Sequence, residues 1–150
     1  MSATSPARTA LVVLDTNVIS EFMRPAPDAG VVAWVSRLPP AALCTTAVTV
    51  AEVRFGIARL SGGRRRILLT DTADEVFSAF ADRVLPFDAS AAGYYADIVV
   101  ERDRAGAPLS GFDAQIAAIC KARFASLATR NTSDFSRLGL HLIDPWTTDA

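Results

Sequence analysis

The chain has 150 residues, of which 51% are hydrophobic and 21% are charged, a composition that suits one globular domain with a sizeable core and excludes intrinsic disorder. Its formal net charge of −1 excludes a globally basic nucleic-acid binder, so any contact with RNA must use a local patch. No apolar run approaches the roughly 20 residues that a membrane span needs, and the chain begins without the charged and apolar regions of a signal peptide. Cys44 and Cys120 stand in apolar settings without a C-x-x-C spacing, which favours two buried thiols and a cytoplasmic protein.

Strand-like apolar runs alternate with helical spacing along the chain. We expect a flexible leader over residues 1–9, a single domain over 10–147 and a tail over 148–150. The apolar run over 11–14 predicts a buried strand, and helical spacing follows it until the prolines after Arg24. The helices expected after this point are one capped by Asp28, one over 46–60, one over 64–82, one from Asp88 to 105 and one opened by Asp113. The strands expected between and after them lie over 42–45, 83–87, 126–129 and 140–143.

This alternation predicts an α/β fold with three layers, in which helices cover both faces of a mostly parallel sheet of about five strands. In the helix predicted over 64–82, the apolar positions are Ile67, Leu68, Val76, Phe77 and Phe80. The first strand is not followed by G-x-G-x-x-G or G-x-x-x-x-G-K-[ST], so we expect no nucleotide cofactor.

Acidic residues mark the ends and starts of several predicted elements. Asp15 ends the first strand, Glu52 lies early in a helix, and Asp113 opens another. Because ligand sites in open α/β sheets lie at the carboxyl ends of the strands, these three carboxylates are expected to share one cleft. The strand ending at Thr129 brings Arg130, Asn131 and Asp134 to the same edge. Several close carboxylates repel one another unless a cation is bound, and hard oxygen ligands suit Mg²⁺ or Mn²⁺.

Each acidic residue also has a purely structural explanation. Asp15 is an ordinary N-cap residue, Glu52 suits a solvated helix face, and Asp113 is a favourable charge near a helix N-terminus. Asp134 can cap the turn after Thr132. Asp113 is the hardest to explain in this way, because its segment is otherwise uncharged until Lys121.

Four motifs in one order resemble those of the PIN-domain ribonucleases, and most closely those of the VapC/FitB-type toxins of bacterial toxin–antitoxin pairs. The motifs are VLDTNVISE at 13–21, TVAEVRFG at 49–56, DAQIAA at 113–118 and ATRNTSDF at 128–135. The resemblance extends from residue 11 to residue 146 and implies a PIN-like fold.

The resemblance implies a role for each matching position. Asp15 and Asp113 match the principal metal-binding aspartates, and Glu52 matches the acidic residue that binds metal directly or through water. Many members of the family have an aspartate where this chain has Asn131, and the nearest carboxylate here is Asp134, so both remain candidates for the fourth position. The substrate-binding candidates are Thr16 and Asn17, which shape the turn that presents Asp15, and Thr129 and Arg130, whose hydroxyl and guanidinium suit bound water and phosphate.

The activity implied is Mg²⁺- or Mn²⁺-assisted hydrolysis of RNA phosphodiester bonds by an endoribonuclease toxin. The partners implied are an RNA substrate, a cognate antitoxin that inhibits the toxin, and a second copy in a homodimer that joins a larger toxin–antitoxin assembly. Two alternatives remain open: a catalytically silent PIN-like interaction module, and a phosphatase or DNA nuclease that uses the same carboxylates.

The remaining polar residues carry less information. Arg64, Arg65 and Arg66 suit an RNA path or an acidic partner segment, but also a solvated helix start. His141, the single histidine, is expected in the last strand, away from the cleft and partly exposed. Nucleophilic catalysis is therefore disfavoured, because neither cysteine has a nearby base.

Overall fold

The computed structural model describes residues 10–147, so the leader and the tail predicted for the two ends lie outside the described residues, and the domain boundaries stay predictions. Strands and helices alternate as expected. The strands are β1 (Val12–Leu14), β2 (Leu43–Thr46), β3 (Val84–Leu85), β4 (Ser126–Ala128) and β5 (Leu142–Ile143). The α-helices are α1 (Thr16–Phe22), α2 (Ala29–Ser36), α3 (Ala47–Ala58), α4 (Arg64–Ser78), α5 (Ala89–Arg104) and α6 (Gly111–Arg123), with short 3-10 turns at Pro40–Ala42 and Ala81–Arg83.

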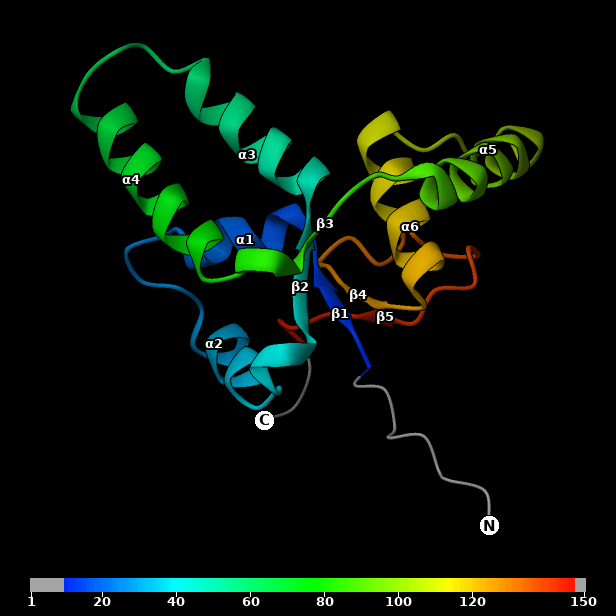
Figure 1. Cartoon of the computed structure of the whole chain (residues 1–150), viewed down its shortest axis with the longest axis horizontal. Coiled ribbons are helices and arrows are strands. Elements are labelled where there is room, and N and C mark those ends of the chain that lie inside the picture. The colour runs from blue at the N-terminus through cyan, green and yellow to red at the C-terminus, as the bar shows by residue number, and fades with distance from the viewer. Residues whose placement is uncertain (1–9, 148–150) are drawn as a thin grey trace.

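The five strands form one parallel sheet in the order β3-β2-β1-β4-β5 (Figure 1). The central strand is β1, in which Val13 pairs with Cys44 of β2 on one side and with Leu127 of β4 on the other. Because all five strands run the same way, their carboxyl ends lie at one edge of the sheet. The predicted parallel sheet is confirmed, and this edge is where the acidic motifs are expected to meet.

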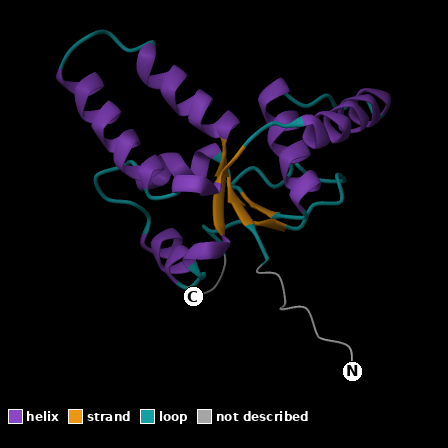
Figure 2. Cartoon of the chain, viewed as in Figure 1, coloured by secondary structure: helices purple, strands orange, loops and turns teal. Residues whose placement is uncertain are grey.

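Helices cover both faces of the sheet, as Figure 2 shows. The alternation of side chains along β1 explains this arrangement, since Val12 and Leu14 pack into one core while Val13 packs into the other. The first core contains side chains of α1, α2, α3 and α4, and the second is built mainly from α5 and α6. The predicted three-layer α/β/α architecture is confirmed.

Side-chain caps define where most helices begin. Asp28 accepts a hydrogen bond from the amide of Val31, and Asp88 accepts one from that of Ala91, as the sequence predicted. The last long helix differs from the prediction: α6 begins at Gly111, and Ser110 rather than a later residue is its N-cap. Asp113 therefore lies in the first turn of α6 and does not open the helix.

Not every apolar position named for the helix over 64–82 is buried. The side chains of Ile67 and Leu68 are 62% and 55% exposed. The cause is that α3 and α4 form a hairpin that extends away from the sheet, and the first turns of α4 lie at its far end (Figure 1). Only the later part of α4 reaches the sheet, where Phe77 is buried.

The other polar and sulfur-containing predictions can be checked directly. Both cysteines are free and buried, and burial raises the pKa of each thiol, as expected for small hydrophobic residues. His141 is exposed and lies just before β5, with its Nδ1 atom 3.0 Å from the hydroxyl of Ser126. Among residues 10–147, no helix combines the length and the apolar composition that a membrane crossing requires.

A pair of isoleucines tests this division between core and surface. We expect Ile116→Ala to lower the free energy of unfolding by about 2–5 kcal/mol, because the side chain is fully buried and its loss leaves a cavity. Ile67→Ala is the matched control in another helix, and its effect should stay within about 0.5 kcal/mol. Urea denaturation of both variants measures the difference, and similar losses would contradict the exposed position of Ile67.

Candidate active site

Asp15 occupies the end of β1 and the start of α1 at the same time. Its Oδ1 atom accepts a hydrogen bond of 2.8 Å from the amide of Thr16, and its Oδ2 atom accepts one of 2.8 Å from the hydroxyl of Thr129. The side chain is only 4% exposed. Asp15 is therefore the helix cap that one explanation predicted, and it is also a buried carboxylate at the edge where the other explanation placed a site.

Burial controls the charge of Asp15. Loss of hydration raises its pKa from 3.8 to about 6, and repulsion from Asp113 and Glu52 adds to the effect. The hydrogen bonds from Thr129 and Thr16 act in the opposite direction because they stabilise the carboxylate. These hydrogen bonds, and a longer one of 3.4 Å from Nδ2 of Asn17 to Oδ2, thus do not compensate for the removal of this charge from water.

Thr129 connects the first and last motifs. Its side chain is fully buried, and its hydroxyl also accepts hydrogen bonds from Nδ2 of Asn17 and from the amide of Asn131. Asn17 in turn accepts a hydrogen bond from the amide of Arg130 through Oδ1. The structure therefore places Asn17 and Thr129 as supports of Asp15 and of the turn after β4, and their contact with substrate stays a prediction.

Glu52 lies half-buried in the second turn of α3. Its Oε1 atom accepts a hydrogen bond of 2.8 Å from the hydroxyl of Thr16, the residue directly after Asp15. Burial raises the pKa of Glu52, the bond from Thr16 opposes the rise, and the charge of Asp113 reinforces it. Glu52 is thus not a solvated residue of the helix face, as the structural explanation proposed.

Asp113 lies in α6, on the other face of the sheet, and its charge acts on Asp15 and Glu52. Burial raises its pKa, the hydroxyl of Ser110 opposes the rise, and the charge of Asp134 adds to it. Asp134 itself is exposed in the turns after β4, and Asn131, also exposed, accepts a hydrogen bond from the amide of Asp134 through its carbonyl. The charge of Asp113 thus acts on Asp15 and on Glu52, and the charge of Asp134 acts on Asp113.

This proximity does not amount to a finished coordination sphere. Within residues 10–147, no group of three or more Asp, Glu, His or Cys side chains is placed so that it could hold a metal ion. The chemistry of the donors nevertheless fits a hard divalent cation, because all are carboxylates and three have a raised pKa that a cation would lower.

A groove of about 1090 Å³ begins at this acidic cluster and runs between α1, α3 and α4. Thr16 and Glu52 line one part of it, Arg64 and Arg65 line another, and the walls between are mainly apolar. Sequence reasoning did not predict this groove. The side chains that form its apolar walls are Phe22, Met23, Val53, Ile57, Leu60, Leu68 and Leu69.

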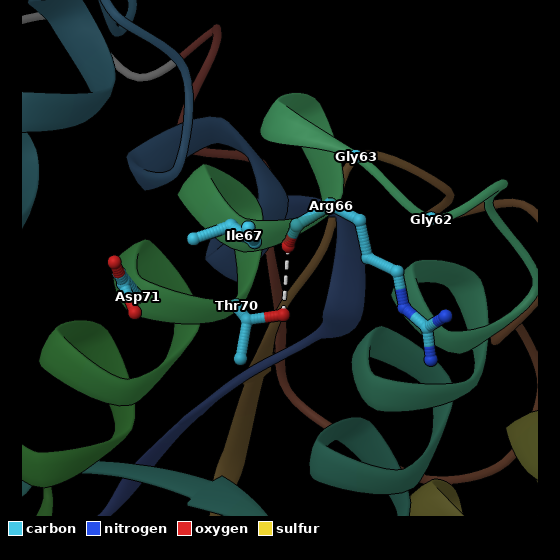
Figure 3. Close-up of a pocket in the computed structure, with 6 residues that line it drawn as sticks. All are labelled: Gly62, Gly63, Arg66, Ile67, Thr70 and Asp71. Atoms are coloured by element: carbon cyan, nitrogen blue, oxygen red, sulfur yellow. Dashed lines mark hydrogen bonds between the residues drawn. The ribbon is translucent and has the colours of Figure 1, made fainter.

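Two further basic residues named in the sequence analysis, Arg130 and Arg66, lie at separate places. The guanidinium of the exposed Arg130 stacks over the ring of Trp146, 4.9 Å from its centroid. Arg66 lines a smaller hollow at the α3–α4 loop, where the hydroxyl of Thr70 donates to the carbonyl of Arg66 (Figure 3). None of the predicted site residues lines this hollow.

Sequence reasoning also overlooked two buried threonines. Thr46 caps α3 and Thr49 lies one turn before Glu52, with its hydroxyl 3.1 Å from that of Thr16. Their signal in the sequence is weak, because threonine at the start of a helix is common.

Comparison with known proteins gives a consistent result. A family model described as the PIN domain matches residues 12–140. VapC ribonuclease Y4jK of Sinorhizobium fredii is 42% identical over 137 residues, which cover 91% of this chain and 98% of that protein. Toxin FitB of Neisseria gonorrhoeae is 37% identical, over 91% of this chain and 99% of its own length.

A solved structure supports the same relationship. The crystal structure of FitAcB from Neisseria gonorrhoeae contains a chain that is 37% identical and superimposes with a TM-score of 0.84, over 92% of this chain and 100% of that one. The family match covers most of the sequence, and both relatives are matched almost from end to end. This chain therefore belongs to the PIN-domain family, in the group that includes the VapC and FitB toxins.

Proposed function

We propose that this protein is a divalent-metal-dependent endoribonuclease and the toxin of a toxin–antitoxin pair. The observation that carries the proposal is the carboxylate of Asp15, whose pKa is raised to about 6 mainly by burial and further by the charges of Asp113 and Glu52. A fold that needed only a helix cap would not need two further carboxylates from other helices beside it. One relative is named a ribonuclease and another a toxin, which supports RNA as the substrate class and an antitoxin as the inhibitor.

In this proposal the carboxylates bind the cation, and one of them accepts a proton. Asp15, Glu52 and Asp113 would hold Mg²⁺ or Mn²⁺, with Asp134 or Asn131 in the fourth position. When bound, such a cation supplies a water of lowered pKa and offsets the charge that develops on the phosphate. One of these carboxylates would accept the proton of the attacking water. Arg130, exposed at the same edge of the sheet, binds a phosphate of the RNA.

The proposed partners follow from the same surface. The antitoxin would place a segment along the groove between α1, α3 and α4 and so reach Thr16 and Glu52 at the acidic cluster. A second copy of the chain would complete a homodimer, which joins the antitoxin in a larger assembly. The proposed location is the cytoplasm.

A catalytically silent interaction module is the second candidate. The observation that favours it is that the described residues contain no set of three ligands grouped to hold a metal ion. The two candidates differ in what the carboxylates do: in the nuclease they bind a cation, and in the silent module they only shape the fold.

Asparagine substitutions separate these candidates. We expect Asp15→Asn and Asp113→Asn each to reduce Mn²⁺-dependent RNA cleavage at least ~100-fold, because each removes a charged ligand of the proposed cation. Asp71→Asn, the same change at an exposed residue in the α4 hollow, should leave cleavage unchanged. Cleavage of labelled RNA by antitoxin-free protein measures the effect, and single-stranded DNA and a phosphate monoester test the other substrate classes. Wild-type protein that binds no Mn²⁺ and cleaves no RNA would establish the silent module.

The fourth position can be resolved in the same assay. We expect Asp134→Asn to reduce cleavage more than Asn131→Ala, because Asp134 carries a charge that acts on Asp113, whereas the side chain of Asn131 is neutral. Both residues are exposed, so neither change should lower stability by more than about 0.5 kcal/mol. A larger effect of Asn131→Ala would assign the position to the amide instead.

The raised pKa of Asp15 also predicts how stability depends on pH. A carboxyl whose folded pKa lies above its unfolded value stabilises the fold below the unfolded pKa, and this contribution is lost as the pH rises through the folded pKa. In EDTA, stability should therefore fall between pH 3.8 and about 6, with about 3 kcal/mol arising from Asp15. Urea denaturation across this range, compared with Asp15→Asn, isolates the effect. If both proteins change in parallel, Asp15 is not the group responsible.

A further inference from the structure

Three threonine hydroxyls lead from the start of α3 to Glu52. Thr49 is fully buried, and its Oγ1 atom lies 3.1 Å from Oγ1 of Thr16 and 3.3 Å from Oγ1 of Thr46. The hydroxyl of Thr16 lies 2.8 Å from Oε1 of Glu52. The chain of contacts is therefore Thr46, Thr49, Thr16 and then the carboxylate.

The number of protons determines the direction of this chain. Each hydroxyl has one proton to donate, and a carboxylate can only accept. Thr16 uses its proton on Glu52, so the contact between Thr49 and Thr16 must use the proton of Thr49. Thr46 then donates to Thr49, while its oxygen accepts the amide of Thr49 at 3.0 Å. Every proton in the chain consequently points toward Glu52.

We propose that Thr49 is a positioning residue for Glu52, an inference that rests on the proposed nuclease function. Its proton occupies the oxygen of Thr16 and so turns the proton of Thr16 toward Oε1 of Glu52. The bonds strengthen one another because each hydroxyl is polarised by its neighbour in a buried setting. The half-buried Glu52 is thereby held at the cleft. Repulsion from Asp113 and the open groove beside Glu52 would otherwise favour a turn of its side chain toward solvent.

The rival explanation is that Thr49 only completes the cap of α3. The cap bond uses the amide of Thr49, however, and does not involve its hydroxyl. Valine at this position keeps the amide and the branched shape but removes the hydroxyl, which is both the donor to Thr16 and the acceptor of the bond from Thr46. A loss that follows from the missing hydroxyl can therefore be separated from a loss of the cap.

Binding of Mn²⁺ to antitoxin-free protein, measured from the EPR signal of the free ion, tests the proposal alongside RNA cleavage. We expect Thr49→Val to weaken Mn²⁺ binding about 10-fold and to lower kcat more than it raises KM for RNA, because outer-shell partners of metal ligands typically have effects of this size. Thr49→Ser restores the hydroxyl and should recover most of the affinity. If Thr49→Val does not fold, Thr49→Ala and Thr49→Ser give the same comparison.

Thr45→Val is the matched control. Thr45 is also fully buried in β2, but its hydroxyl donates to the carbonyl of Leu14 and does not lead to Glu52. We expect this variant and Thr49→Val both to lose thermal stability, because each removes a buried hydrogen bond, but we expect Thr45→Val to bind Mn²⁺ like the wild type. Equal losses of Mn²⁺ affinity in the two variants would overturn the proposal and leave Thr49 a structural residue.

A double substitution tests the route through Thr16. If Thr49 acts on Glu52 only through Thr16, then Thr49→Val should not weaken Mn²⁺ binding further in a Thr16→Val background. Additive losses would contradict that route. Wild-type protein that neither binds Mn²⁺ nor cleaves RNA would refute the proposed function and this inference together. An active wild type matched by Thr49→Val would refute the inference alone.

Discussion

The burial of the Asp15 carboxylate is the constraint on which the rest of the structure depends. A central strand of a parallel sheet must be apolar on both faces, and β1 meets that requirement until its last residue is followed by a charge. Thr129 and the amide of Thr16 donate to the two oxygens of that carboxylate, so the end of β4 and the start of α1 are held at one point. Burial still outweighs these bonds and raises the pKa of Asp15 to about 6. The same residue therefore orders the edge of the sheet and leaves there a charge that a cation would stabilise.

Hydrogen bonds of neutral side chains connect Asp15 and its neighbours to two other segments of the chain. On one side Thr129 and Asn17 connect Asp15 to the turn that carries Arg130 and Asn131. On the other side Thr16 connects the start of α1 to Glu52 and to the buried threonines at the start of α3. Among the described residues, no buried side-chain nitrogen or oxygen lacks a hydrogen-bond partner, so these connections satisfy the groups that the fold removes from water. The carboxylates are thus placed by amides and hydroxyls, which hold them without cancelling their charge.

The α3–α4 hairpin extends away from the sheet, and its outer end packs little against the core (Figure 1). Its outer turns expose Phe55, Ile67 and Leu68, and its inner side forms a wall of the groove that leads to Glu52. The single ion pair across the described part of the hairpin joins Arg54 to Asp74 at an exposed position, where such pairs contribute little. An element of this kind presents apolar and basic surface next to the carboxylates, which is the property expected of a surface that receives a partner.

The sequence by itself determined the order of elements, the parallel sheet, the place of Asp15 at the end of the first strand and that of Glu52 in the helix after the second strand, because hydrophobic period, proline breaks and capping residues are local signals. It also placed the carboxyl ends of the strands at one edge, since this follows from parallel topology alone. It did not determine the start of α6, which begins at Gly111 and not at Asp113. Only the tertiary structure decided that Ile67 and Leu68 are exposed, because the helical period shows which side chains share a face but not whether that face reaches the sheet. The same holds for Thr49, because its hydroxyl contacts the hydroxyl of Thr16, which belongs to another helix and lies 33 residues earlier in the chain. Contacts between distant segments depend on how the layers pack, and no local pattern records them.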